Sequence, residues 1–207
     1  MKGIIFDLDG TLLDSDEAVF MLFNDILKRF GFKERSMKEV MSYRGNTTER
    51  WIKQLLPEIS GEELGMMGRY GRMRYASWFL PKYGKEMAGA GKILRYLKEK
   101  GMKIAVVTNQ VKEEVEKSLE VIGFRDFDVV VSSENIKNPK PDPDSIEYCI
   151  KKMNLRKKDV VLVGDSKIDF ETGKNAGVEV ILLKNRYNSD LKCKKISSLE
   201  ELKDLIF

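Results

Sequence analysis

The chain contains no histidine among its 207 residues. That absence excludes serine–histidine triads, histidine phosphatases and metal sites built from imidazole. Acid–base chemistry must then depend on carboxylates, lysine, tyrosine or cysteine, and a bound metal is expected to be a hard cation with oxygen ligands. Cysteine is scarce as well, and Cys149 and Cys193 have neither a partner spacing nor neighbouring ligands. We therefore expect two isolated thiols rather than a zinc site.

The sequence also lacks a long apolar run and a strong excess of one charge. No uncharged apolar stretch approaches the roughly 20 residues of a membrane-spanning helix, and nothing resembles an export signal. Lys and Arg total 37 against 33 Asp and Glu, and the net charge of +4 is scattered along the chain. We therefore expect a cytoplasmic protein with neither a membrane nor a nucleic-acid partner. The sequence leaves the oligomeric state open between a monomer and a homodimer.

Five short apolar segments rich in β-branched residues predict the strands of a sheet. They are residues 3–6, 103–107, 128–132, 160–163 and 178–183. Each is a nearly continuous apolar run, which is typical of a strand buried on both faces of a parallel sheet. Helical patterns precede the last four strands, at residues 89–100, at 112–122, after an N-cap at Asp142 and at 168–176. Alternating strands and helices indicate a doubly wound α/β core.

The segment between the first and second strands is far longer than one crossover needs. It shows helical patterns only, at residues 17–30, 48–56 and 61–80. We predict an all-helical insert of residues 16–83 within an α/β core domain of residues 1–15 and 84–207. The large apolar side chains expected to pack inside this insert are Met66, Met67, Met73 and Trp78.

The first candidate for chemistry is the segment Asp7-Leu8-Asp9-Gly10-Thr11. It lies at the carboxyl end of the first strand, where ligands of open α/β sheets bind. At positions i and i+2 of an extended chain, Asp7 and Asp9 project to the same side. Gly10 lets the backbone approach a ligand closely. These features favour an acidic site over an Asp-rich turn.

Polar side chains also follow the later strands. Thr108-Asn109 offers a hydroxyl and backbone N–H groups for phosphoryl oxygens, and three prolines in residues 138–143 stiffen the loop that carries Lys140. Asp165 and Asp169 follow the fourth strand and could bind or orient a metal. Because all of these residues come at strand ends of one sheet, they predict a phosphoryl-transfer enzyme.

These pieces, in this order, resemble the motifs of the haloacid dehalogenase superfamily. Asp7-Leu8-Asp9-Gly10-Thr11 is similar to its first motif, Thr108-Asn109 to its second, Lys140-Pro141 to its third, and Gly164-Asp165-Ser166 with Asp169 to its fourth. The insert is similar to the cap of the phosphoglycolate phosphatase and β-phosphoglucomutase branch. The resemblance implies a Rossmann-like α/β core with a helical cap domain inserted after the first strand.

The resemblance also implies catalytic roles. Asp7 would attack phosphorus and form an aspartyl-phosphate. Asp9 would protonate the leaving oxygen and then take a proton from water. Lys140 and Thr108, with Asn109 beside it, would bind the phosphoryl oxygens.

A metal ion and a substrate loop are implied in the same way. Mg²⁺ would lie on the Asp7 carboxylate, the Asp9 backbone carbonyl and the Asp165 carboxylate, and Asp169 would hold Lys140 or a metal-bound water. In the insert, residues 43–47 resemble the specificity loop of the branch. There Arg44, with Gly45 beside it, could pair with a second anionic group such as the carboxylate of phosphoglycolate.

The function expected from these residues is Mg²⁺-dependent hydrolysis of a small-molecule phosphate monoester, as in phosphoglycolate phosphatase. A sugar-phosphate mutase of the β-phosphoglucomutase kind shares all four motifs and stays open. A signalling receiver domain is disfavoured, because its phosphoacceptor Asp follows a middle strand and no helical cap intervenes. A catalytically silent binding protein has no support, because no catalytic position is replaced.

Overall fold

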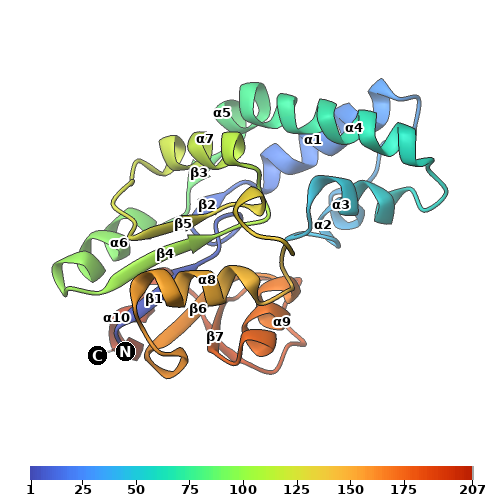
Figure 1. Cartoon of the computed structure of the whole chain (residues 1–207). Helices are drawn as coiled ribbons and strands as arrows, with labels where there is room; N and C mark the ends of the chain where they lie inside the picture. The colour runs from blue at the N-terminus through green and yellow to red at the C-terminus, as the bar shows by residue number, and fades with distance from the viewer. Residues whose placement is uncertain (207) are drawn as a thin grey trace.

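A parallel sheet forms the centre of the computed structural model, which describes residues 1–206 (Figure 1). Strand β1 (Gly3–Phe6) pairs with β4 (Lys103–Val107) on one side and with β6 (Val160–Gly164) on the other. Strands β5 (Val129–Val131), β7 (Glu179–Leu183) and β8 (Lys194–Ile196) complete the sheet. Over the described residues the order is β5-β4-β1-β6-β7-β8, and every pairing is parallel.

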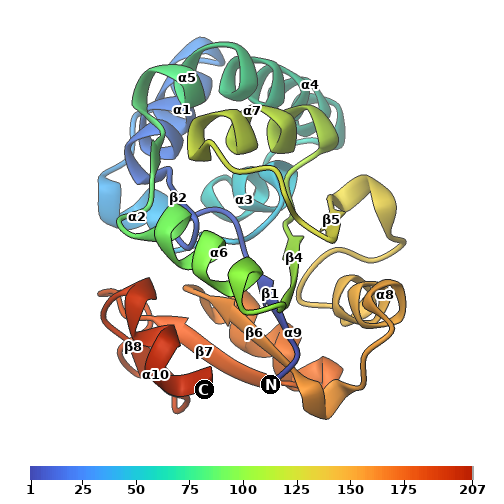
Figure 2. The ribbon, with the colours of Figure 1, turned by 90° about the vertical axis from the view of Figure 1, so that its left-hand side faces the viewer.

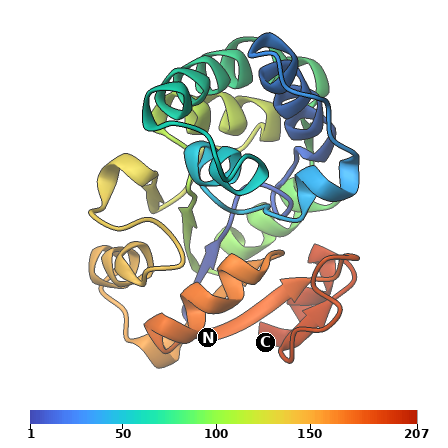
Figure 3. The same ribbon diagram turned by 90° about the vertical axis from the view of Figure 1, so that its right-hand side faces the viewer.

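Helices cover both faces of this sheet, because successive side chains of a strand point to opposite faces. Ile4 and Phe6 of β1 pack on the face covered by α6 (Ala90–Glu99), α7 (Lys112–Ile122) and α10 (Leu202–Ile206), which Figure 2 shows. Ile5 packs on the other face, against α8 (Asp144–Met153) and α9 (Lys167–Ala176), as Figure 3 shows. Burial on both faces explains the unbroken apolar runs of the central strands.

A set of helices interrupts the chain between β2 (Leu13–Asp14) and β3 (Lys85–Glu86). Its members are α1 (Asp16–Arg29), α2 (Met37–Met41), α3 (Thr48–Leu55), α4 (Gly61–Arg74), the π-helical turn η1 (Tyr75–Phe79) and α5 (Leu80–Tyr83). Ser36, Thr47 and Ser60 cap three of these helices by accepting a backbone N–H, which satisfies donors that a helix start leaves free. Because β2 and β3 pair antiparallel, the chain leaves the core and returns to it at neighbouring points.

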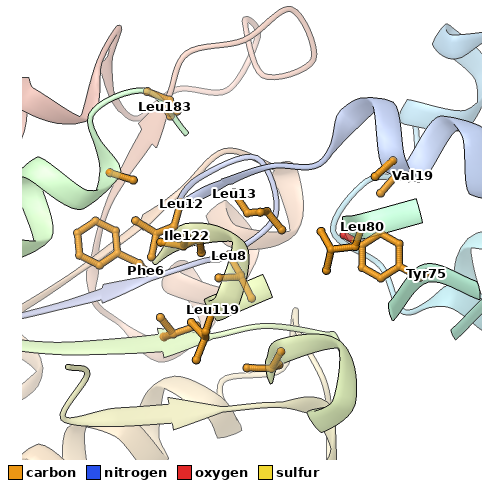
Figure 4. Packing of buried hydrophobic residues seen from close by; sticks show 14 of the residues in the cluster. Phe6, Leu8, Leu12, Leu13, Val19, Tyr75, Leu80, Leu119, Ile122 and Leu183 are labelled. Carbon is orange, nitrogen blue, oxygen red and sulfur yellow. The ribbon is translucent and has the colours of Figure 1, made fainter. Parts of the chain in front are cut away.

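The insert and the core share one cluster of buried apolar side chains. Figure 4 shows Phe6 and Leu8 beside Leu119 of α7, with Leu80 and Tyr75 of the insert further along the same cluster. Helix α7 contacts both α5 and η1 across the junction. The helices of the insert are therefore packed on the carboxyl side of the sheet. The domain boundaries after residues 15 and 83 stay a prediction, and residue 207 of the second core segment lies outside the described residues.

The α/β fold expected from the sequence is confirmed, and the differences are local. Pro143 takes the N-cap position of α8 that was predicted for Asp142, and Asp142 instead accepts the N–H of Asp144 at 3.2 Å. The prediction that the insert buries its large apolar side chains is right for Met67 and wrong for Met66, Met73 and Trp78, which are 41%, 56% and 49% exposed. Met66 and Met73 are seven residues apart and therefore share the outer face of α4.

Within residues 1–206, the helices are too short or too polar for any of them to cross a membrane.

Candidate active site

The site lies where the carboxyl ends of β1, β4 and β6 meet at one edge of the sheet. Asp7 follows β1, Thr108 follows β4 and Asp165 follows β6, while Lys140 comes from the loop between β5 and α8. Parallel strands bring their carboxyl ends to the same edge, so these residues gather although they are far apart in sequence. The structure thus places together the residues that the sequence predicts for phosphoryl transfer.

Lys140 is the centre of this cluster. Its Nζ donates to Asp7 Oδ1 at 2.6 Å and to Asp169 Oδ1 at 2.7 Å, and the side chain is 1% exposed. Burial disfavours the ammonium charge, but Asp169 and Asp7 outweigh it and raise the pKa of Lys140. The lysine therefore stays a cation between two buried carboxylates.

Asp169 is saturated by donors from the protein. Its Oδ2 accepts from Ser166 Oγ at 2.5 Å, from the Ser166 N–H at 3.0 Å and from the Asp165 N–H at 3.3 Å, while Oδ1 accepts from Lys140. Burial acts to raise the pKa of Asp169, but Lys140 and the Ser166 donors hold it below its ordinary value. These contacts fit a role in holding Lys140 rather than a direct metal ligand.

Asp165 is the acid whose contacts best fit a metal ion. Its Oδ2 accepts from Asn185 Nδ2 at 2.9 Å and faces Arg44 Nη2 at 3.1 Å. Its Oδ1 is buried and has no hydrogen-bond partner among the described residues. Burial raises the pKa of Asp165 to about 7, although Arg44 opposes the shift. A buried acceptor without a donor is costly unless something else satisfies it.

The surrounding charges also fit a cation. Carboxylate oxygens of Asp7, Asp165 and Asp169 all lie within 4.8 Å of one another. Burial, followed by repulsion from Asp169 and Asp165, raises the pKa of Asp7 well above its ordinary value, although Lys140 opposes the shift. A set of carboxylate oxygens with one unsatisfied member suits a hard ion such as Mg²⁺.

Thr108 and Asn109 lie in the site, but they use their side chains differently. Thr108 is 4% exposed and its Oγ1 accepts the Gln110 N–H at 3.1 Å. The Asn109 Oδ1 accepts the backbone N–H of Lys140 at 2.9 Å. Its Nδ2 donates to the Lys140 carbonyl at 3.1 Å and to the Gly45 carbonyl at 2.8 Å. Asn109 therefore fixes the backbone of Lys140 and ties the loop at Gly45 to the core.

Arg44 reaches from the insert into the core, and its guanidinium contacts protein acids. Its Nη2 lies 2.7 Å from Asp16 Oδ1 and 3.1 Å from Asp165 Oδ2. Gly10 permits this approach: it has a φ of +78°, and an added Cβ would touch the Arg44 guanidinium and lie 2.6 Å from Asp165 Oδ2. Arg44 was predicted to pair with an anionic group of the substrate. In this structure its guanidinium instead contacts two carboxylates of the protein.

Asp9 is held by three donors that were not predicted from the sequence. Its Oδ1 accepts from Ser15 Oγ at 2.7 Å and from Tyr75 Oη at 2.9 Å, and its Oδ2 accepts from Gln110 Nε2 at 2.7 Å. Gln110 directly follows the predicted pair Thr108-Asn109, so its position at the same strand end could have identified it as a residue of the site. Tyr75 is 66 residues from Asp9 in sequence, and no local pattern links the two.

A cavity of about 60 Å³ opens beside Asp7 and Asp9. Its polar wall includes Thr108, Gln110 and Glu114, and several apolar side chains of the insert line it as well. These apolar residues are Val19, Leu22, Phe23, Met41 and Trp51. The space suits a few water molecules or a small leaving group next to the two acids.

Glu114 lies in the wall of this cavity, and its burial gives an expected pH dependence of stability. Burial raises the pKa of Glu114 to about 8, against 4.5 for an exposed glutamate, although the Val111 N–H opposes the shift. Between pH 4.5 and 8 the folded state keeps a proton that the unfolded state loses, so the free energy of unfolding falls as the pH rises. Glu114→Gln should remove this loss and make the variant more stable than the natural protein at pH 9, by a few kcal/mol at about 1.4 kcal/mol per pKa unit.

Urea unfolding of both proteins at pH 5 and pH 9 measures this difference. Glu113→Gln, an exposed neighbour on α7, is the matched control and should change the free energy of unfolding by less than about 0.5 kcal/mol at either pH. A constant difference between Glu114→Gln and the natural protein across this range would contradict the raised pKa.

Comparison with known proteins gives a consistent set of relatives. A family model described as haloacid dehalogenase-like hydrolase matches residues 4–183. Phosphoglycolate phosphatase of Nitrosospira multiformis is 30% identical over 100% of this chain and 96% of its own length. Pyrophosphatase PpaX of Halalkalibacterium halodurans is 29% identical over 88% of this chain and 83% of its own length.

A solved structure agrees in fold. The crystal structure of a protein described as a predicted phosphoglycolate phosphatase from Haemophilus somnus 129pt matches with a TM-score of 0.89. The match covers 100% of this chain and 98% of the other, at 24% identity. At that identity the likeness supports the arrangement of the elements rather than a substrate.

Proposed function

The chain belongs to the haloacid dehalogenase-like hydrolase family and is a phosphatase, and from this premise we propose that it hydrolyses a small-molecule phosphate monoester through a phosphorylated Asp7. The observation that carries the proposal is the buried contact of Lys140 with Asp7 and Asp169, next to the unsatisfied oxygen of Asp165. This arrangement offers a nucleophile, a fixed cation and an open acidic ligand within one small volume. Phosphoryl transfer depends mainly on such positioning and charge stabilisation.

Asp7 attacks phosphorus with one carboxylate oxygen while its Oδ1 stays in contact with Lys140. The bond from Asp7 to phosphorus forms as the bond from phosphorus to the ester oxygen breaks. Asp9 gives its proton to that leaving oxygen and then takes a proton from the water that hydrolyses the aspartyl-phosphate. Lys140 and the Thr108 hydroxyl bind the phosphoryl oxygens during both steps.

The residues that would hold Mg²⁺ are Asp7, the backbone carbonyl of Asp9 and Asp165, with Asp169 supporting Lys140 beside them. When bound, the ion would reduce the repulsion between the anionic nucleophile and the anionic substrate. We further propose that residues 16–83 act as a cap domain that closes the site and selects the substrate. For phosphoglycolate, Arg44 would exchange one of its carboxylate partners in the protein for the carboxylate of the substrate.

Metal dependence tests the proposal most directly. A panel of phosphoglycolate, hexose phosphates and inorganic pyrophosphate should be incubated with the protein in Mg²⁺ and in EDTA. We expect phosphate release from at least one monoester in Mg²⁺, a fall to the uncatalysed rate in EDTA, and recovery when Mg²⁺ is restored. Release that continues unchanged in EDTA would contradict the metal site, and no release from any ester would contradict the function.

A sugar-phosphate mutase would use the same residues and differs only in what accepts the phosphoryl group. The phosphatase is favoured because curated proteins similar to this chain include a phosphoglycolate phosphatase and a pyrophosphatase. The same panel separates the two activities, since a mutase converts one hexose phosphate into its isomer while releasing little free phosphate.

A further inference from the structure

The carboxylate of Asp9 is bound by donors from three separate parts of the chain. Ser15 precedes α1, Gln110 follows β4, and Tyr75 opens the π-helical turn η1 of the insert. Two of these donors share Oδ1, and Gln110 binds Oδ2 at 2.7 Å. The carboxylate is therefore fixed in orientation rather than free to rotate about its χ2 bond.

The amide of Gln110 is itself oriented by two contacts. Its Oε1 accepts from Ser118 Oγ at 3.0 Å, and its backbone N–H donates to Thr108 Oγ1 at 3.1 Å. A carboxylate accepts hydrogen bonds, so the Nε2 side of the amide must face Asp9. Gln110 is 6% exposed, and this burial keeps competing water from the bond.

Tyr75 brings a donor from the insert to an acid of the core. Its side chain is 4% exposed and lies beside Leu80 in the shared apolar cluster (Figure 4). Burial, followed by the nearby Asp9 and Glu114, raises the pKa of Tyr75 well above 10, so the phenol stays a neutral donor. The hydrogen bond exists only while the insert packs on the core, because its two partners belong to different parts of the chain.

We propose that Tyr75 and Gln110 are positioning residues that hold Asp9 in line with the leaving oxygen, so that its proton transfer is efficient. This inference rests on the proposed function. A displacement of a reacting group by about 1 Å can cost about 100-fold in rate, so each residue carries an effect of about 10- to 100-fold on the step that needs the proton.

The two residues should affect only those esters whose leaving group needs a proton. An alkoxide leaving from ethyl phosphate takes the proton of Asp9 as the ester bond breaks. Acetate leaving from acetyl phosphate is stable as an anion and departs without one. Acetyl phosphate is a mixed anhydride rather than an ester, but it has nearly the same shape as ethyl phosphate, so binding in the small cavity is matched while the demand for acid catalysis differs.

The experiment measures kcat/KM of the Mg²⁺-loaded protein for ethyl phosphate and for acetyl phosphate, because this constant reports the steps up to departure of the leaving group. Tyr75→Phe and Gln110→Met are each expected to lower kcat/KM for ethyl phosphate about 10- to 100-fold and to leave the value for acetyl phosphate within about threefold. The kcat for acetyl phosphate should fall in both variants, since Asp9 still has to take a proton from the hydrolytic water.

Tyr70→Phe is the matched control. Tyr70 also donates from the insert to a carboxylate, Asp25 Oδ2 at 2.8 Å, but it lies outside the cavity at Asp9. Loss of the Tyr70 hydroxyl should leave kcat/KM unchanged for both ethyl phosphate and acetyl phosphate. An equal fall in kcat/KM for ethyl phosphate and acetyl phosphate, or no fall in kcat/KM for ethyl phosphate in either variant, would overturn the positioning role. Phosphate release from ethyl phosphate by the natural protein separates a failure of the positioning role from a failure of the proposed function. If the natural protein hydrolyses neither these two compounds nor any ester of the panel above, the proposed function fails, and this inference fails with it.

Discussion

Asp7→Asn is expected to lower phosphate release by at least about 10⁴-fold, because removal of a covalent nucleophile leaves only binding and charge stabilisation. The amide keeps an oxygen that can accept from Lys140, so the contact seen at 2.6 Å has a substitute. Burial and the neighbouring carboxylates raise the pKa of Asp7, so a neutral side chain relieves repulsion at this position. The variant should therefore fold, with a thermal midpoint equal to or above that of the natural protein.

Two measurements check this result. Steady-state release of phosphate gives the rate, and intact-protein mass after rapid acid quench gives the phosphorylated fraction, which hydroxylamine should remove. The natural protein should carry the label and Asp7→Asn should not. Asp190→Asn changes an exposed acid and should keep both activity and label. A labelled Asp7→Asn protein would show that another residue accepts the phosphoryl group.

Lys140→Met is expected to destabilise the fold as well as abolish activity. Methionine fills a similar volume, but Asp7 and Asp169 then face each other in the interior without the cation that joins them. Removal of one partner from a buried charge network costs about 3–5 kcal/mol. For a chain of this size that loss lowers the thermal midpoint by roughly 10 °C.

Acid should partly restore the stability of Lys140→Met. The pKa of Asp7 is raised even in the presence of Lys140, and it rises further once the lysine is lost. Between the ordinary pKa of 3.8 and this raised pKa, folded Asp7 keeps a proton that the unfolded chain loses, so the free energy of unfolding falls as the pH rises, and the variant should be destabilised less at pH 5 than at pH 8. Urea unfolding at the two values measures the difference. Lys167→Met, whose side chain is 71% exposed, should cost less than about 1 kcal/mol. Equal stability of Lys140→Met and the natural protein would contradict the importance of the buried network.

The central strands were predictable because burial on both faces demands unbroken apolar runs. The structure places β1 and β4 at the predicted residues. Strands β6 and β7 differ from the prediction by one residue at one end, and β5 is one residue shorter at each end. The edge strand β8 escaped prediction because it is three residues long and begins with two lysines, of which Lys194 is exposed and Lys195 half-buried, so only Ile196 is a buried apolar residue. Helix α2 is five residues long and shows no periodicity, although its Ser36–Glu39 capping box was a readable signal.

The candidate site was predictable to the extent that it depends on strand ends. Asp7, Thr108 and Asp165 directly follow strands, so the parallel sheet brings them together whatever the loops do. Contacts made by the insert were not predictable in this way. Tyr75 reaches Asp9, and Arg44 reaches Asp165, through packing between segments that no local pattern connects. The catalytic and metal-binding roles of all these residues stay predictions until the variants are measured.

The pairing of β2 with β3 has an evolutionary consequence. Leu13 pairs with Glu86 and Asp14 with Lys85, so the two ends of the insert lie one strand spacing apart, about 5 Å. A module with adjacent ends can be exchanged or enlarged without shifting the register of the strand that carries the nucleophile. Such an exchange is constrained by the shared apolar cluster and by the contacts of Tyr75 with Asp9 and of Arg44 with Asp165, which a replacement would have to match. If the insert selects the substrate, as proposed, then the catalytic residues and the substrate preference can be inherited separately, through replacement of this one segment.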